Sequence, residues 1–553
     1  MICGSMKKLF LLTAVCVAAS SYGVAQTAVP ARDTSIKGAT IEVIQSYKPE
    51  VKQRPKQEYT PSLPPVDNTH PVFNYNVPQQ TLNYSYNSLP LRPLALGRDT
   101  TLPPYPNYVK LGGGNLSTLF LDAGIGSLKG KNYETAFHLH SITQQGSIQD
   151  QKSSLTDFEA DGTLHKASGQ WHGFVDAMRN QYSYFGYNHD LYQPTADSIK
   201  QTFTSVKVGA DMQKENAADS KFNYHPAIAA SIYADKFSTT ETSFTLNAPF
   251  YYRIDSSLDL QIAANGIFTQ YKNAQQSFSN NIIQFDPGIN YHTGSFTAHA
   301  YLSPAIGSNE NYLLPNLGAT YNIPKTLFTI NAGWTASVRQ NTYEQLTTEN
   351  PYIFNSFVAP QGMYAPQQTR SDEVYGGIQT NLGNHLSLSG RVSWWQYDHL
   401  PVFLNNIGDQ KQFSVLYDNN LNATSLQAAL TYKVANKFSA DVQGIFYTYF
   451  NGSQAKAWQE PGIRLRGSLL YRPIAALSLT AYANVLDQIY ALQNATIVKL
   501  DPTLDIGGSA EYQLIPRLSV FLQVNNLLNN KNERWLGYQS YGTNIYGGLR
   551  FKF

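Results

Sequence analysis

The end of the chain, TNIYGGLRFKF (residues 543–553), decides the fold. Read at the two-residue period of a β-strand, its apolar face carries Ile545, Gly547, Leu549, Phe551 and Phe553, and its polar face carries Asn544, Tyr546, Gly548, Arg550 and Lys552. A free sheet edge that ends on aromatic residues invites aggregation unless the sheet closes on itself. The last strand therefore raises the question of a closed sheet, which the rest of the sequence has to answer.

The composition of the 553 residues is that of an all-β protein. Charged residues make up only 14%, aromatic residues make up 13%, and 38 glycines and 28 prolines supply turn positions. A mean hydropathy of -0.32 and a net charge of +2 exclude a bundle of apolar membrane helices and give no sign of a nucleic-acid partner. Both values suit a membrane β-barrel, because only every second residue of a barrel strand faces lipid.

Residues 1–25 have the pattern of a secretory signal peptide. Lys7 and Lys8 precede an apolar run, and small residues precede a predicted cleavage site after Ala25. Both cysteines lie within this segment, so the mature chain would contain none. A lipoprotein site at Cys16 is the less favoured alternative, since Val15 is too large for the residue before such a cysteine. An uncleaved anchor is also disfavoured, because the apolar run is too short to cross a ~30 Å hydrocarbon core.

Two regions of different character follow the signal peptide. Residues 26–106 contain prolines at short intervals, which predicts an extended arm rather than a folded domain. Residues 107–553 alternate between apolar and polar positions almost throughout, with no sustained helical period. Their spacing predicts a closed antiparallel transmembrane β-barrel of about 22 strands, within a range of about 18 to 24. A β-propeller or β-solenoid is disfavoured, because no repeat of fixed period is found.

Aromatic residues gather near the ends of several predicted strands. The clearest groups are NQYSYFGY (residues 180–187), SWWQYDH (393–399) and IFYTYF (445–450). Amphipathic rings at strand ends are typical of the belts that contact the membrane–water interfaces. We therefore expect these groups to belong to such belts; the alternative explanation is the strand propensity of aromatic residues alone.

The last 33 residues carry a family resemblance. FLQVNNLLNNKNERWLGYQSYGTNIYGGLRFKF (residues 521–553) resembles the last two strands of TonB-dependent receptors, which close with an NLxN turn, an aromatic-rich loop and a terminal aromatic strand. The resemblance implies that this strand closes an outer-membrane barrel. It further implies a signal read by the barrel-assembly machinery, carried by Tyr546, Leu549, Phe551 and Phe553.

The chain departs from that family at its N-terminal end. Receptors of the family carry a plug domain inside the barrel, whereas the sequence here offers only the proline-rich arm, residues 26–106. Within the arm, Thr40, Ile41, Glu42, Val43 and Ile44 are similar to a TonB box, a short segment that pairs by strand addition with a partner's edge. The segment is either such a partner-binding strand or an ordinary extended part of the arm.

The sequence shows no catalytic pattern. His138 and His140 share one strand face but have no identifiable third ligand, which favours polar residues that face the lumen over a metal site. LGGGNLST (residues 111–118) lacks the lysine and helix of a phosphate loop and is better interpreted as a turn between early strands. No serine stands in a nucleophile elbow. We therefore expect neither enzymatic activity nor a cofactor.

Two functions remain open for an outer-membrane protein in contact with lipid. The first is transport or binding of a solute, for which a TonB-like protein is the candidate partner. The second is a structural or assembly role in an envelope complex, without transport. A barrel of this size needs its lumen filled, and the arm is long enough to do so. The polar residues expected to face the arm across the lumen are Asp501, Asp505, Glu511, Arg464 and Arg466.

Overall fold

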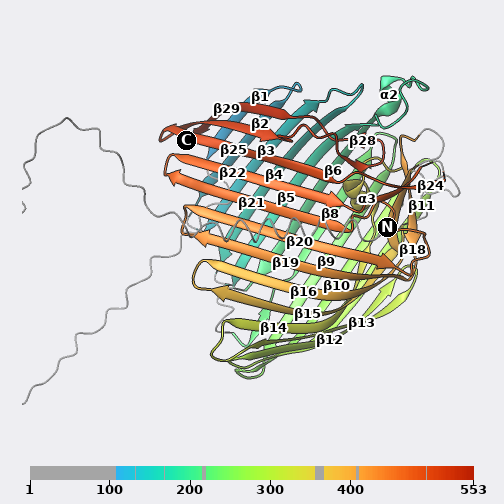
Figure 1. Ribbon diagram of the computed structural model, residues 1–553. Coiled ribbons are helices and arrows are strands. Elements are labelled where there is room, and N and C mark those ends of the chain that lie inside the picture. The colour runs from blue at the N-terminus through green and yellow to red at the C-terminus, as the bar shows by residue number, and fades with distance from the viewer. Residues whose placement is uncertain are drawn as a thin grey trace, which may run out of the picture. The chain divides into compact units, whose positions relative to one another are not determined.

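The computed structural model describes residues 107–553 apart from 131, 167, 215–219, 355–365, 406–409 and 494, and these described residues form one closed β-barrel (Figure 1). Each strand pairs antiparallel with its neighbours. The barrel strands are β1 (Tyr108–Gly114), β2 (Leu119–Lys129), β3 (Tyr133–Gln145), β4 (Lys152–Lys166), β5 (Gly169–Ser183), β6 (Lys200–Gln213), β7 (Phe222–Tyr224), β8 (Ala227–Asp235), β9 (Thr240–Arg253), β10 (Leu258–Lys272), β11 (Ser277–His292), β12 (Phe296–Gly307), β13 (Asn311–Asn322), β14 (Phe328–Gln340), β15 (Gln368–Leu382), β16 (Leu386–Asp398), β19 (Leu421–Val434), β20 (Phe438–Phe450), β21 (Ile463–Ile474), β22 (Leu477–Asp487), β25 (Thr503–Ile515), β26 (Leu518–Asn525) and β29 (Asn544–Lys552).

Two of these segments act as one barrel strand. β7 and β8 both pair with β9 in a single continuous register, from Phe222↔Tyr252 to Ala227↔Asn247 and onward. They are separated at Pro226, which has no N–H to donate to the ladder. The barrel therefore has 22 strands, and the predicted fold class and strand number are confirmed.

The barrel closes where the first strand meets the last. β29 lies between β26 and β1, and its pairing with β1 runs from Tyr108↔Lys552 to Gly114↔Tyr546. The backbone N–H of Phe553 donates to the carbonyl of Asn107 at 3.2 Å. No edge of the terminal strand is left free, which explains how a chain can finish on an apolar strand.

The glycine-rich stretch at residues 111–118 corrects one expectation. Leu111–Gly114 belong to β1 and pair with β29, so that Gly112 faces Gly548 and Gly113 faces Gly547, and only residues 115–118 form a turn. A Cβ on Gly548 would lie 1.8 Å from the carbonyl oxygen of Leu111. The glycines are needed for close contact between strands, which their turn propensity concealed.

The two faces of the wall differ as the alternation predicts. Leu549 and Phe551 of β29, and Phe553 directly after it, are about half exposed and point outward, toward lipid in a membrane. Tyr546, on the opposite face of the same strand, is buried and packs against Phe120 and Phe521 inside the barrel.

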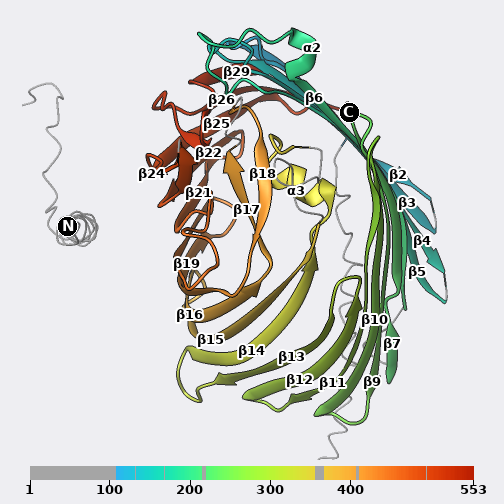
Figure 2. The same ribbon diagram turned by 90° about the vertical axis from the view of Figure 1, so that its right-hand side faces the viewer.

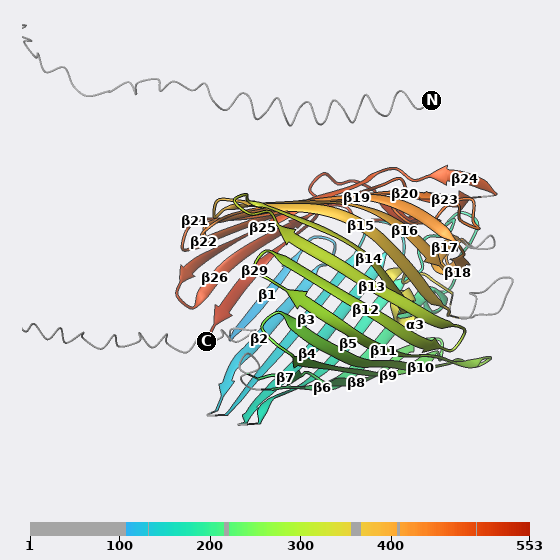
Figure 3. The ribbon, with the colours of Figure 1, turned by 90° about the horizontal axis from the view of Figure 1, so that it is seen from below.

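The two ends of the barrel also differ. One end has short turns, such as residues 130–132, 293–295 and 475–476, whereas the other has long connections, such as residues 341–367, 399–420 and 526–543. This asymmetry is typical of outer-membrane barrels. Figure 3 shows that the extra elements gather at the long-loop end. These elements are α2 (Ala196–Ile199), α3 (Tyr343–Glu349), β17 (Leu400–Asn405), β18 (Phe413–Asp418), β23 (Tyr490–Gln493), β24 (Thr496–Lys499), β27 (Glu533–Trp535) and β28 (Tyr538–Gln539).

Long loops fold inward and pack on one another, and we call this assembly the lid (Figure 2). Its apolar core joins the tops of the barrel strands to α3 and to the hairpins β17–β18 and β27–β28. Tyr352 stacks on Tyr538 with ring centroids 3.5 Å apart, and Phe403 and Phe413 pack edge-on against Trp535. The members of this core are Phe185, Phe203, Tyr233, Tyr271, Tyr343, Leu346, Ile353, Phe403, Phe413, Val415, Tyr417, Trp535 and Tyr538.

The lid overturns part of the expected aromatic belt. Tyr184, Phe185 and Tyr187 are buried among the loops instead of facing lipid. Trp394 does point outward, but the alternate residue Trp395 faces the lumen, where its indole N–H donates to Ser425. The prediction failed because rings near a strand end can serve either the membrane interface or the interior, and the strand period alone does not separate these uses.

Among the described helices, none has the length and apolar character needed to cross a membrane.

Candidate functional site

A basic hollow of about 480 Å³ opens on the inner wall next to the lid. Its charged residues are Arg464 and Arg466 of β21 and Arg534 of the β27–β28 hairpin, and we call it the arginine pocket. Arg464 and Arg466 share the inner face because they are two residues apart, while Leu469 and Tyr471 point outward. The remaining lining residues are Gln443, Ile445, Pro461, Leu465, Asn484 and Leu486.

The hairpin β27–β28 positions the third arginine. The guanidinium of Arg534 lies 4.1 Å from the ring centre of Trp535, and Arg534 donates a hydrogen bond to the carbonyl of Gln459. Burial lowers the pKa of Arg534, an effect that Glu460 and Glu349 oppose. Arg534 also lines a second hollow of about 460 Å³ along β22, β25 and β26, so it stands between two lumenal spaces.

Two carboxyl groups from different loops lie beside these arginines. Glu460 pairs with Arg464 at 2.7 Å between Oε2 and Nη2. Glu349, the last residue of α3, hydrogen-bonds to Glu460; burial, together with that neighbour, raises the pKa of Glu349 to about 7. The side chain of Arg466 has no ion pair or hydrogen bond with the described residues, so its guanidinium remains available to a ligand.

Stacked aromatic pairs flank the pocket on the inner wall. Trp395 and Tyr397 stack at 5.6 Å on β16, and Tyr447 and Tyr449 stack at the same centroid distance on β20. The guanidinium of Arg464 lies 5.8 Å from the ring centre of Tyr447. The wall therefore offers flat apolar surfaces next to the positive charges.

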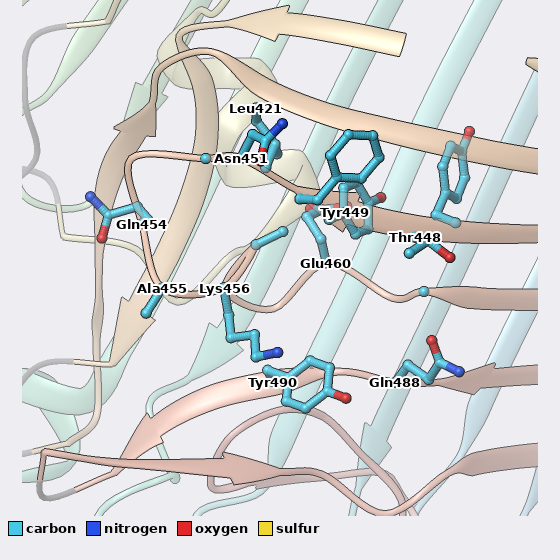
Figure 4. Close-up of a pocket in the computed structure, with 15 residues that line it drawn as sticks. Leu421, Thr448, Tyr449, Asn451, Gln454, Ala455, Lys456, Glu460, Gln488 and Tyr490 are labelled. Carbon is cyan, nitrogen blue, oxygen red and sulfur yellow. The ribbon is translucent and has the colours of Figure 1, made fainter. Parts of the chain in front are cut away.

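A smaller outer pocket of about 270 Å³ adjoins this region, between the residue 451–462 loop and the ends of β20 and β23 (Figure 4). Lys456 lies over Tyr490 with its ammonium 4.6 Å from the ring centre. Glu460 and Tyr449 lie close together in the lining of this pocket, as the figure shows.

The histidines singled out in the sequence face the lumen on β3. Nε2 of His138 and Nδ1 of His140 lie 3.3 and 3.2 Å from the same Asp122 oxygen, and His138 also lies 3.7 Å from Glu159. Within the part of the chain that the structure describes, no group of three or more His, Cys, Asp or Glu residues could hold a metal ion. The lumenal placement agrees with the interpretation favoured from the sequence.

The other predicted residues are placed as follows. The residues of the predicted assembly signal lie at the closing strand, and they are Tyr546, Leu549, Phe551 and Phe553. Tyr546 points inward and the other three point outward, so the four side chains form no continuous surface. The segment similar to a TonB box lies outside the described residues, as does the whole arm. Its residues are Thr40, Ile41, Glu42, Val43 and Ile44. Of the residues expected in the lumen, Arg464, Arg466, Asp505 and Glu511 lie on the inner face, and Asp501 precedes β25.

Sequence reasoning missed Arg534, Glu460 and Glu349. All three lie outside the barrel strands, where no two-residue period assigns a side chain to the lumen or to the lipid. Arg534 stands next to Trp535 in the otherwise polar stretch NERW (residues 532–535). This pairing of an arginine with an aromatic ring could have indicated that Arg534 is held in a folded loop.

Comparison with solved structures identifies the fold. The chain is similar to the FrpB iron transporter from Neisseria meningitidis, with a TM-score of 0.63 and 11% identity over 81% of each chain. It is also similar to two Pseudomonas aeruginosa proteins. The first is the ferric enterobactin receptor PfeA, with a TM-score of 0.59 and 12% identity over 81% of this chain and 80% of that chain. The second is the siderophore receptor PirA, with a TM-score of 0.57 and 12% identity over 81% of this chain and 79% of that chain. The resemblance to receptor barrels is thereby confirmed at the level of the fold. No family model matches the sequence, and no curated protein matches it.

Proposed function

We propose that this chain is an outer-membrane receptor that binds an anionic solute in the arginine pocket and passes it through the barrel. The arginine pocket is the observation that carries the proposal, because it gathers three guanidinium groups within one hollow of about 480 Å³. The proposal is supported by the fold, which is shared with an iron transporter and with siderophore receptors. An anionic metal chelate is accordingly the ligand class that we favour.

The charge balance of the pocket favours an anion. Arg464, Arg466 and Arg534 contribute three positive charges, whereas the adjacent Glu460 carboxylate pairs with Arg464 alone, and burial raises the pKa of the neighbouring Glu349. A guanidinium presents paired N–H donors that match the geometry of carboxylate and phosphate. Inside a lumen with walls of low dielectric, such donors bind an anion more strongly than in bulk water.

The neighbouring aromatic pairs suggest a second property of the ligand. Tyr447 and Tyr449 stack on the wall beside Arg464, so a planar or apolar part of a solute would contact their rings while its charged group contacts the arginines. A hollow of this size lies within the range that small-molecule ligands occupy.

The proposal extends to location and partners. Export would follow cleavage after Ala25, and insertion would depend on the barrel-assembly machinery acting on the strand that ends at Phe553. Transport against a gradient across the outer membrane would need an energy source, for which a TonB-like protein paired with residues 40–44 is the candidate. The barrel wall would contact lipid through its apolar face.

The binding proposal is tested with the full mature chain purified in detergent, with citrate and ferric citrate as probes in calorimetry. We expect Arg464→Gln or Arg466→Gln to weaken binding about tenfold each, which corresponds to one lost charge-assisted contact. The matched control is Arg391→Gln, an inward arginine of β16 that lies 4.0 Å from the ring centre of Tyr375 and outside the pocket. Equal weakening by the control, or no binding by the unaltered chain, would remove this function. Recovery of a stable envelope complex from a chain that binds no anion would favour the structural role.

A further inference from the structure

We infer that the Glu460 carboxylate occupies, in the closed lid, the position of the ligand's anionic group. An entering anion would then displace Glu460 from Arg464 and free the residue 451–462 loop. The inference rests on the proposed function, because it assumes that an anion binds in the arginine pocket. It adds that the unliganded site is blocked by the chain's own carboxylate and that binding changes the lid.

The two partners of this ion pair differ in how firmly the fold holds them. Arg464 belongs to β21, which is paired on both sides within the barrel wall. Glu460 lies in the connection between β20 and β21, outside any strand. Its side chain is 11% exposed, whereas that of Arg464 is 43% exposed and can be approached by a solute. An exchange of partners would therefore move Glu460 and leave Arg464 in place.

The residue before Glu460 is in an unfavourable conformation. Gln459 has a φ of 62°, in the left-handed region that residues with a Cβ seldom adopt. Its side chain is fully buried, and both its Nε2 and its Oε1 lack a hydrogen-bond partner among the described residues. Both features raise the free energy of the closed loop, so this conformation has to be held by contacts around it.

Those contacts come from three separate connections. The N–H of Gln459 donates to the carbonyl of Tyr490 at 2.9 Å, and its own carbonyl accepts from Arg534. Glu460 is held by Arg464 of the wall and by Glu349 of α3. An anion that binds both Arg464 and Arg534 would compete with the contacts on two consecutive residues, Gln459 and Glu460.

The ion pair also joins the linings of two hollows. Glu460 lines the outer pocket of about 270 Å³, and Arg464 lines the arginine pocket of about 480 Å³. Withdrawal of the Glu460 side chain would break the ion pair that links the two linings. The displaced carboxylate would then leave a passage between the outer pocket and the lumen.

The first arm of the test measures affinity. Citrate binding is compared by calorimetry in the unaltered chain, in Glu460→Gln and in Glu373→Gln, the last being an inner-wall carboxylate outside the pocket that pairs with Arg391 at 3.5 Å. We expect Glu460→Gln to bind citrate about tenfold more tightly, because a competing charge-assisted contact is lost, and Glu373→Gln to bind like the unaltered chain.

The second arm measures loop release and separates it from a simple change in charge. Lys456 is the one basic residue in the sequence of the 451–462 loop, so trypsin cleavage after it, followed by mass spectrometry, reports on this loop. We expect citrate to accelerate this cleavage severalfold in the unaltered chain, and Glu460→Gln to be cleaved at the fast rate without citrate.

The outcomes distinguish this inference from the proposed function. If citrate binds in an Arg464-dependent manner while neither citrate nor Glu460→Gln changes cleavage at Lys456, the inference is wrong and the receptor function stands. If citrate binds to neither the unaltered chain nor Glu460→Gln, the proposed function fails first. If Glu373→Gln binds citrate as tightly as Glu460→Gln does, the gain in affinity comes from the lost negative charge in general and not from the position of Glu460. That result would also overturn the inference.

Discussion

The closing seam and the lid solve the same problem in different ways, since each joins segments that are far apart in the sequence. The seam joins β1 to β29 by a continuous backbone ladder, and glycines allow the strands to approach closely. The lid joins α3 and two hairpins through side chains, namely the aromatic core and the charges around Glu460. A ladder of backbone bonds opens as a unit, whereas side-chain contacts can be exchanged individually. We therefore expect the wall to keep one structure and the contacts of the lid to be the ones that change.

The largest expected effect follows from a methyl group added to the seam. Gly548→Ala would bring a Cβ to 1.8 Å from the Leu111 carbonyl oxygen and to 2.6 Å from the Gly112 Cα. We expect most of the protein to fail to close, seen as loss of the heat-modifiable band on a denaturing gel. The control is Gly376→Ala on β15, where a Cβ would meet nothing within 4 Å. Equal folded fractions for Gly548→Ala and Gly376→Ala would show that the seam tolerates the added methyl group. The contrast between a rigid seam and a changeable lid would then be wrong.

A charge at the very end of the chain should reduce assembly next most strongly. Phe553→Asp would place a carboxylate on the apolar outer face, where Phe553 and Phe551 lie with ring centres 6.4 Å apart. We expect the amount of protein in the outer membrane to fall severalfold. The same substitution at Asn451, in a loop of the lid end, should leave it nearly unchanged. Unaltered outer-membrane levels in Phe553→Asp would remove the predicted assembly signal.

Deleting residues 30–100 asks whether the lid alone closes the lumen. We propose that the arm fills part of the lumen, because a barrel of 22 strands is wide and polar residues such as Asp505, Glu511 and Arg466 line it. The deletion should then raise single-channel conductance and sensitivity to bulky antibiotics. Wild-type values for both, together with loss of a partner complex, would instead make the arm an external tether.

Loss of one large ring from the lid core should have a smaller and more local effect. Trp535→Ala removes a buried indole that contacts Phe403 and Phe413, at a cost of about 3 kcal/mol. We expect faster trypsin cleavage in the lid loops while the barrel remains heat-modifiable. Trp394→Ala, which removes an indole exposed on the outer face, should leave cleavage unchanged. Loss of the folded barrel in Trp535→Ala would mean that lid and wall are not separable.

The smallest expected effect is a pH dependence confined to the lid. Burial, then Glu460, raises the pKa of Glu349 from 4.5 to about 7, against the opposing charges of Arg339 and Arg534. Because the folded pKa lies above the unfolded one, the contribution of Glu349 to the stability of the closed lid is largest below about pH 4.5, is lost as the pH rises toward 7, and then changes no further.

Hydrogen exchange of the 451–462 amides, corrected for intrinsic rates, should therefore accelerate across that pH window, by about tenfold for each pKa unit of the shift that is lost when the lid opens. Glu349→Gln should remove the dependence, whereas Glu344→Gln in the same helix should retain it. A flat profile in the unaltered chain would show that Glu349 does not control the lid.

The seam was predictable from the sequence and the lid was not, for a physical reason. The alternation in residues 543–553 places Phe551 and Phe553 on one apolar face of a strand, and the resemblance of residues 521–553 to receptor barrels implied that this strand closes the wall. The same alternation identified Arg464 and Arg466 as lumenal. It had nothing to say about Arg534 or Glu460, whose positions depend on how loops pack on one another. It also could not separate buried lid residues such as Tyr184 from rings that contact lipid.

The hydrogen bond between the Phe553 N–H and the Asn107 carbonyl means that the described barrel begins and ends at one place, at the short-turn end. Its connectivity is therefore that of a ring that has been cut once. A circular permutant that joins residue 553 to residue 107 through a short linker, and starts instead at the turn of residues 383–385, would keep every strand pairing. Such a chain separates the two roles of the last strand, since β29 would still close the wall but would no longer supply a free C-terminal phenylalanine.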